Sequence, residues 1–316
     1  MSSATAHGTV AELLTPELLE EARGLALVAR RLAEGALHGL HRSPFYGFSV
    51  EFAEHREYSP GDELKHLDWK VLGRSERYVI KQYEQETNLR GLIVLDRSLS
   101  MDYGEKTLTG EEVKRPTKFE YGRILAAGMT HVLLSQGDSV GLLMATEEIT
   151  HQLAPRAHRG QLLSVCATLL QAEPTSGTDL PGALQQLAAQ LSRRSLVVLI
   201  SDLFDDPDGL LDVLGQLHHR GHEVLIFQVM DPTERDFDLG QTSHGVTVIE
   251  DMETGAEFKA EPHMIQHLVQ KEIKKFLAHL DEGVRRFGLH MVRCLTSDPV
   301  EKILREYLRT RKIGER

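Results

Sequence analysis

The stretch Leu92-Ile93-Val94-Leu95-Asp96-Arg97-Ser98-Leu99-Ser100-Met101 runs from four apolar residues into an acid and two serines on alternate positions. The apolar part predicts a strand buried on both faces, as in a parallel sheet. Open α/β sheets bind ligands beyond the carboxyl ends of their strands, which is where this acid and these hydroxyls fall. Carboxylate and hydroxyl oxygens are hard donors that suit Mg²⁺ or Mn²⁺. The same residues also fit a turn that caps the next helix, because Asp and Ser side chains accept bonds from nearby backbone N–H groups.

The chain beyond this stretch alternates between strand-like and helix-like segments. Buried strands are expected over residues 92–96, 139–145, 196–201, 223–229 and 290–294, with an edge strand over 149–153. Helices are expected over 118–135, 161–170, 180–191, 210–219, 265–287 and 300–308, and a hairpin over 246–249 and 257–259. The alternation predicts an α/β fold of three layers, in which helices cover both faces of a mostly parallel central sheet.

The first 88 residues differ from this pattern. Thr15-Pro16-Glu17 is a favourable helix start, because it offers a capping hydroxyl, a proline at the first helical position and an acid near the positive helix end. The apolar stripe that follows predicts an amphipathic helix, and strand-like segments at 48–52 and 78–83 flank a turn at 58–62. We therefore expect an N-terminal helix and β/turn segment over 1–88, a main domain over 89–296 and a C-terminal helix over 297–316.

Composition narrows the class of protein. The 316 residues carry a formal net charge of −11, which argues against a nucleic-acid platform. The only two cysteines, Cys166 and Cys294, lie in apolar stretches and predict buried thiols in a reducing compartment. The sequence contains no apolar run of membrane-spanning length and no signal-peptide pattern at its start. We expect a cytoplasmic protein with no membrane span.

Two further loops are expected at the same edge of the sheet as Asp96. The apolar run 196–200 leads through Ser201 into Asp202, and a right-handed crossover brings the preceding loop, which contains Thr178, to that edge. If the two strands are neighbours, both carboxylates lie together. The candidate ligands of one cation are Asp96, Ser98, Ser100, Thr178 and Asp202. Thr175 and Ser176 are near enough in sequence to replace Thr178.

These five residues resemble the metal-ion-dependent adhesion site of von Willebrand factor A (vWA) domains in order and approximate spacing. The resemblance implies a Rossmann-like three-layer fold in which the hydroxyls and carboxylates hold Mg²⁺, some of them through water. It also implies an open coordination position for a carboxylate that a protein partner supplies.

The N-terminal segment resembles a second pattern, that of the bacterial "domain of unknown function 58" family. The residues that carry it are Gly47, Glu51, Phe52, Arg56, Tyr58, Pro60, Gly61, Asp62, Asp68, Trp69, Lys81 and Glu84. The resemblance implies a segment coupled to a vWA domain and a link to MoxR-type AAA+ ATPases. Arg56, Asp62, Asp68 and Arg74 are candidates for ion pairs that fix the turn, and the arginines are alternatively part of a partner-binding surface.

Several other patterns are open to two interpretations. Asp205 and Asp206 fit a second metal site of a hydrolase, or they cap the helix that begins near Asp208. His218, His219 and His222 lie at a helix end, and the i, i+4 pair His218 and His222 fits a zinc site less well than a solvated helix end, since no third clustered ligand accompanies the pair. The sequence contains no P-loop, no Gly-x-Ser-x-Gly elbow and no dinucleotide fingerprint.

The function expected from these patterns is a non-enzymatic, metal-dependent protein–protein interaction module, with Mg²⁺ or Mn²⁺ as the cofactor. The family resemblance implies that it acts as an adaptor for a MoxR-type AAA+ ATPase in the assembly or remodelling of another complex. The alternatives are a Mg²⁺-dependent phosphoester hydrolase that uses Asp96 and Asp202, and a structural vWA fold with a vestigial site.

Overall fold

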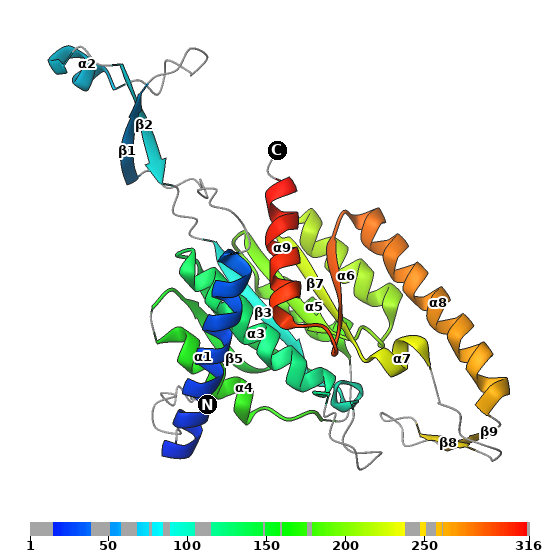
Figure 1. Cartoon of the computed structure of the whole chain (residues 1–316). Coiled ribbons are helices and arrows are strands. Elements are labelled where there is room, and N and C mark those ends of the chain that lie inside the picture. The colour runs from blue at the N-terminus through cyan, green and yellow to red at the C-terminus, as the bar shows by residue number, and fades with distance from the viewer. Residues whose placement is uncertain are drawn as a thin grey trace, which may run out of the picture.

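A six-stranded sheet forms the centre of the molecule (Figure 1). The computed structural model describes residues 15–38, 51–57, 68–75, 78–84, 89–104, 115–147, 149–158, 160–175, 179–237, 247–250, 257–260 and 262–314. The strand order is β10-β7-β6-β3-β4-β5, and every neighbouring pair is parallel except β4 and β5. The strands are β3 (Arg90–Asp96), β4 (Ser139–Ala145), β5 (Ile149–Arg156), β6 (Ser195–Ser201), β7 (Glu223–Met230) and β10 (His290–Leu295).

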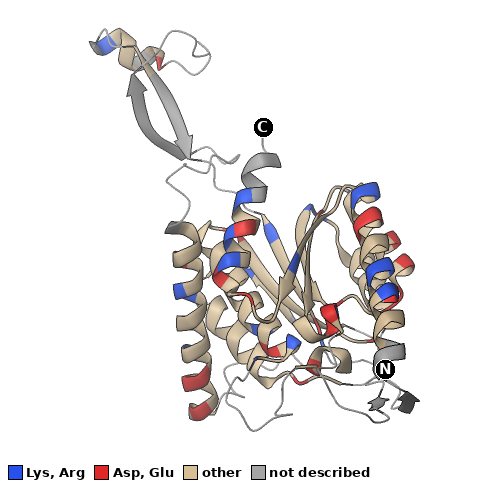
Figure 2. Ribbon diagram, turned by 45° about the vertical axis from the view of Figure 1, so that its right-hand side comes forward, with Lys and Arg blue, Asp and Glu red and all other residues tan. Residues whose placement is uncertain are grey.

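Helices cover both faces of this sheet, as the alternating pattern predicted. Ile93 and Leu95 of β3 belong to the core under one set of helices: α1 (Pro16–His38), α3 (Lys118–Ser135), α4 (Gln161–Gln171) and α9 (Val300–Gly314). Leu92 and Val94 belong to the core under α5 (Leu180–Gln190), α6 (Pro207–His219) and α8 (Pro262–Phe287). The alternation arises because successive side chains of a strand point to opposite faces. The central strands are mainly uncharged, and charged residues gather on the helices and connections (Figure 2). The three-layer α/β prediction is confirmed.

Most element boundaries agree with the sequence-based expectations, and a few differ. The bounds of α3 and β4 are those expected. β5 extends beyond the expected end at residue 153, because its pairing with β4 continues to Arg156 opposite Val140. α6 begins earlier than expected, at Pro207, since Asp206 caps it. The sequence analysis did not predict the 3₁₀ turn at Leu99–Asp102 or the short helix α7 (Pro232–Asp236).

Two small antiparallel pairs accompany the main sheet. β1 (Glu51–Glu57) pairs with β2 (Val79–Glu84), so the first expected strand lies a few residues later than 48–52. The short helix α2 (Trp69–Ser75) lies between them in the sequence. β8 (Thr247–Glu250) pairs with β9 (Glu257–Ala260) as expected. The turn expected at 58–62 lies outside the described residues.

The N-terminal helix packs through its smallest side chains. Ala22, Ala29, Ala33 and Ala36 are all 0% exposed, and α1 contacts α3, α4 and α9 (Figure 1). Its start is capped as expected, since the Thr15 hydroxyl oxygen accepts a bond from the backbone N–H of Leu18 at 3.2 Å. Alanine lets helix axes approach closely, so α1 forms part of the helical layer.

Two smaller expectations concern the cysteines and the membrane. Cys166 and Cys294 are buried and form no disulfide, which confirms the expected buried thiols. Within the described ranges, no helix combines the length and the apolar character needed to cross a membrane.

The packing of α1 leads to a paired test. Ala29→Leu adds a branched side chain to a site with no free surface and is expected to cost about 1–3 kcal/mol of unfolding free energy. Gly24→Ala on the same helix meets nothing within 4 Å and is expected to gain up to about 1 kcal/mol from helix propensity. Urea unfolding of both variants measures the difference, and an equal effect at the two positions contradicts the packing of α1.

Candidate functional site

The two predicted acids lie at one edge of the sheet. Asp96 is the last residue of β3, and Asp202 directly follows Ser201, the last residue of β6. These two strands are parallel neighbours, with Leu95 opposite Ile200. Each acid is 2% exposed. The expectation that adjacent strands bring the two carboxylates together is therefore confirmed.

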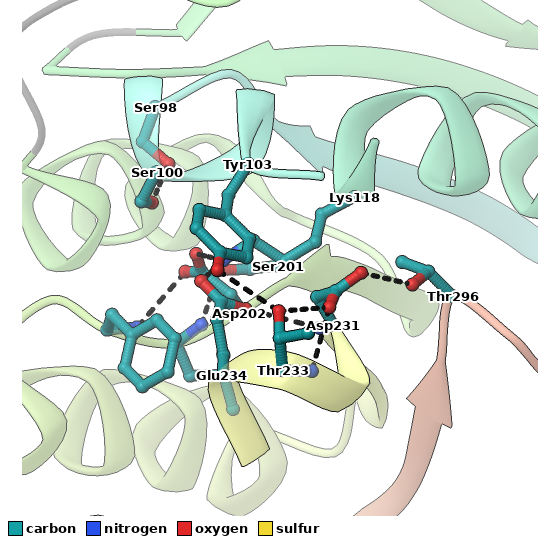
Figure 3. A network of polar contacts seen from close by, with 12 residues as sticks. Ser98, Ser100, Tyr103, Lys118, Ser201, Asp202, Asp231, Thr233, Glu234 and Thr296 are labelled. Atoms are coloured by element: carbon teal, nitrogen blue, oxygen red, sulfur yellow. Dashed lines mark hydrogen bonds and ion pairs between the residues drawn. The ribbon is translucent and has the colours of Figure 1, made fainter. Parts of the chain in front are cut away.

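Asp96 is held by two serines. Its Oδ1 accepts a bond from the backbone N–H of Ser98 at 2.9 Å, and its Oδ2 accepts one from the Ser201 hydroxyl at 2.6 Å. The Ser98 side chain also bonds to it. The Ser98 and Ser100 hydroxyl oxygens lie 2.9 Å apart (Figure 3). The backbone bond is the turn-like contact expected of an Asp, but the Ser98 side chain does not cap the turn that follows. The hydroxyls instead face each other beside the carboxylate.

Asp202 is paired with a buried lysine. Its Oδ2 lies 2.7 Å from the Lys118 ammonium, and its Oδ1 accepts a bond from the backbone N–H of Phe204 at 3.1 Å. The same ammonium lies 2.7 Å from Glu234 Oε1 (Figure 3). Lys118 is 0% exposed and is the first residue of α3. Leu203, between Asp202 and Phe204, has a φ of 63°, a conformation that costs energy for a leucine.

A third acid ends the next strand and organises α7. Asp231 follows β7 and accepts bonds from the Thr233 backbone N–H at 2.8 Å and from the Thr296 hydroxyl at 2.9 Å. In return, Glu234 Oε2 accepts a bond from the Asp231 backbone N–H at 3.1 Å, which completes a capping box. Both carboxylate oxygens of Glu234 are therefore engaged, one by the helix cap and one by Lys118.

Burial and charge shift the ionisation of this cluster. Burial, together with the nearby charge of Asp202, raises the pKa of Asp96 to about 7, although the bonds from Ser201 and Ser98 oppose the shift. Burial alone lowers the pKa of Lys118, but the charges of Asp202 and Glu234 outweigh burial and hold it above its usual value. The Lys118 ammonium thus contacts two carboxylates, and Asp96 is a third acid beside Asp202, so the cluster holds more acidic side chains than basic ones.

This donor set suits a small, hard divalent cation. It combines two carboxylates with the hydroxyls of Ser98 and Ser100, and added positive charge would neutralise the excess acid. No cluster of three or more His, Cys, Asp or Glu side chains suited to a metal occurs in the part of the chain that the structure describes. Thr178, the remaining candidate, lies outside the described residues. Of the nearby alternatives, Ser176 also lies outside them, whereas the Thr175 backbone N–H donates to the Arg97 carbonyl at 2.8 Å.

The other acids and histidines have structural roles. Asp206 caps α6 by accepting from the Asp208 backbone N–H at 3.2 Å, as the capping interpretation predicted. Asp205 Oδ2 accepts from the Leu180 backbone N–H at 2.9 Å, at the start of α5 rather than α6. His218 and His219 are exposed in the last turn of α6, as expected of a solvated helix end. His222 is 5% exposed, so the solvated interpretation is wrong for it.

The expected ion-pair network in the N-terminal segment is only partly described. Asp68 Oδ1 accepts a bond from the Val71 backbone N–H at 3.2 Å, next to the start of α2. Asp62 and the Arg56 side chain lie outside the described residues.

The sequence analysis missed three residues of the site: Lys118, Ser201 and Glu234. Each had a local signal. A lysine at the first position of a helix lies at the positive end of the helix dipole, where a cation is unfavourable without a partner. Ser201 directly precedes the candidate Asp202, and Asp231-Pro232-Thr233-Glu234 has the capping-box pattern of acids three residues apart. None of these signals indicates that the three side chains converge.

The contacts of Ser201 generate a stability prediction. Ser201→Ala removes the donor to Asp96 and the acceptor for the Leu203 backbone N–H at 2.9 Å, and should cost about 1–3 kcal/mol of unfolding free energy. Ser164→Ala, whose hydroxyl bonds within its own helix α4 at a partly exposed position, should stay within about 0.5 kcal/mol. Urea midpoints at constant m-value give the change in unfolding free energy for both variants. Equal losses would show that the contact of Ser201 with Asp96 adds no more stability than the hydroxyl of Ser164.

Comparison with known proteins places the chain in a family. The family described as "Protein of unknown function DUF58" matches residues 54–278. Uncharacterized protein Rv1480 of Mycobacterium tuberculosis is 31% identical over 252 residues, which cover 78% of this chain and 75% of that protein. Similar solved structures include BatB from Bacteroides thetaiotaomicron (14% identity, TM-score 0.42, covering 70% of this chain and 98% of that one). They also include the VWA domain of SpRpn10 (14% identity, TM-score 0.38, covering 69% and 94%). The chain belongs to the DUF58 family, as its N-terminal motifs predicted.

Proposed function

We propose that this chain is a non-enzymatic protein-interaction module that binds a partner's carboxylate through a divalent cation. The cation is Mg²⁺ or Mn²⁺, and the proposed ligands are Asp96, Ser98, Ser100, Thr178 and Asp202. The observation that carries the proposal is the group formed by the buried Asp96 and the two facing hydroxyls of Ser98 and Ser100, which are partly buried, beside Asp202 at the carboxyl edge of the sheet.

The chain's own residues prepare this edge for binding. Ser201 and the Ser98 backbone N–H orient Asp96, and the Phe204 backbone N–H orients Asp202. A cation bound there would supply positive charge and an open coordination position for an incoming Asp or Glu. Hydroxyl ligands add no charge of their own, so such a cation stays attractive to a further carboxylate.

The hydrolase alternative has less support. A two-cation phosphoester hydrolase that uses Asp96 and Asp202 needs a second ion, for which Asp205 and Asp206 are the candidates. Both accept bonds from backbone N–H groups near the starts of α5 and α6. Their engagement in helix starts favours binding over hydrolysis.

The proposed partner is a MoxR-type AAA+ ATPase, which the resemblance to DUF58 proteins implies. In this proposal the chain is an adaptor: the ATPase acts on a client that the metal site holds, during assembly or remodelling of another complex. The free, buried cysteines favour a reducing compartment, so we propose the cytoplasm as the place of action.

Metal binding is tested by thermal unfolding of the full chain in Mg²⁺ or Mn²⁺. A cation at about a hundred times its Kd should stabilise the wild type by about 2.7 kcal/mol. Asp96→Asn keeps the shape of the side chain but removes its charge, so it should lose the shift. Asp206→Asn, at an exposed helix cap, should keep it. A shift in neither the wild type nor Asp206→Asn, at millimolar metal, contradicts a resting metal site.

The adaptor role is tested by affinity capture with a MoxR-type ATPase from the same genome. The wild type should capture the ATPase with or without Mg²⁺. Capture of the client together with it should require Mg²⁺, fall at least about tenfold with Asp96→Asn, and be unchanged with Asp206→Asn, because Asp96 is a proposed ligand and Asp206 is not. Failure of the wild type to capture the ATPase contradicts the adaptor role, and client capture that survives chelation and Asp96→Asn contradicts binding of the client through the metal.

A further inference from the structure

We propose that Lys118 is the chain's built-in counter-cation for Asp202 and that it competes with the divalent cation at this site. Loading the metal then requires Asp202 to exchange the Lys118 ammonium for the cation, while Glu234 retains the ammonium. This inference rests on the proposed function, because it assumes that Asp202 is a metal ligand.

The geometry of Lys118 is that of a cation enclosed by ligands. Its ammonium lies 2.7 Å from one carboxylate oxygen of Asp202 and 2.7 Å from one of Glu234. The rings of Tyr103 and Phe204 have their centroids 5.7 and 5.0 Å from it. The side chain is 0% exposed, so these carboxylates replace water around the charge.

Lys118 and Glu234 are each held by a helix cap, and Phe204 is held by an aromatic contact. Lys118 begins α3 beside the capping box of Thr117 and Glu120. Glu234 is fixed by the capping box of α7. Phe204, which covers the ammonium, stacks on Phe276 of α8 at a centroid distance of 5.3 Å. The ammonium is therefore held in place from several elements, and the simplest exchange is a local turn of the Asp202 carboxylate.

Charge makes the two cations antagonists. A divalent cation on Asp202 would lie close to the ammonium, and repulsion between like charges is strong in a buried site. Glu234 lowers this cost, because it keeps a carboxylate beside the ammonium when Asp202 turns away. The site consequently holds metal weakly at rest, and an added partner carboxylate shifts the balance towards the loaded state.

The competition is tested by titrating the full chain with Mn²⁺ alone. The electron paramagnetic resonance signal of free Mn²⁺ measures how much of the metal is bound. Lys118→Met should bind Mn²⁺ at least about tenfold more tightly than the wild type, because it removes the competing charge. Lys302→Met removes an exposed lysine that pairs with Asp298, and it should leave the affinity within about twofold.

Glu234→Gln should change the Mn²⁺ affinity in the opposite direction to Lys118→Met. It leaves Lys118 with Asp202 as its remaining carboxylate partner, so Mn²⁺ binding should weaken several-fold. If Glu234 acts through the lysine, the same substitution in the Lys118→Met background should change the affinity by less than about twofold. Should Lys118→Met fail to fold with two unpaired acids, comparison of Lys118→Met/Glu234→Gln with Glu234→Gln still measures the effect of the lysine.

The outcomes separate this inference from the proposed function. Equal Mn²⁺ affinity in the wild type and Lys118→Met overturns the competition and leaves the metal site standing. Binding by Lys118→Met but not by the wild type at millimolar Mn²⁺ supports the competition and contradicts a metal-loaded resting protein. Binding by neither overturns both.

Discussion

A buried carboxylate needs a compensating partner, and this sheet buries two of them side by side. The parallel pairing of β3 with β6 makes that juxtaposition unavoidable, because both strands end in an acid at the same edge. The chain compensates the two in different ways. Asp96 receives hydrogen bonds from Ser98 and Ser201, whereas Asp202 forms an ion pair with Lys118, which it shares with Glu234. The chemistry available at the edge follows from this asymmetry.

The ion pair also ties together distant parts of the chain. Lys118 and Asp202 are 84 residues apart, and Lys118 and Glu234 are 116 apart. One ammonium therefore joins the start of α3, the end of β6 and α7. Removing one partner of such a group leaves an uncompensated charge in the protein interior, which typically lowers the unfolding free energy by about 3–5 kcal/mol. The same contact thus contributes to the stability of the fold and sets the charge of the candidate site.

The position of Lys118 depends in turn on how α3 is packed. The helix packs against strands of the sheet and also contacts α1 and α9, the N-terminal and C-terminal helices (Figure 1). Two glycines permit this close packing. A Cβ on Gly122 would lie 2.9 Å from the Leu95 side chain, and one on Gly128 would lie 2.9 Å from Leu304 of α9. The terminal helices therefore pack on the same helix whose first residue, Lys118, belongs to the site.

The sequence by itself determined the fold class and indicated four residues of the candidate site. Continuous apolar runs predict buried parallel strands. The acids that follow these runs are expected at the carboxyl edge of the sheet, so Asp96, Ser98, Ser100 and Asp202 could be proposed as neighbours without coordinates. Only the tertiary structure decided what compensates those acids. Lys118, Ser201 and Glu234 come from segments whose local patterns describe a helix start, a strand end and a helix cap. Their convergence depends on strand order and on the packing of α3 and α7. A local sequence pattern predicts the helix or strand in which it lies. It does not predict which distant segments that element will contact.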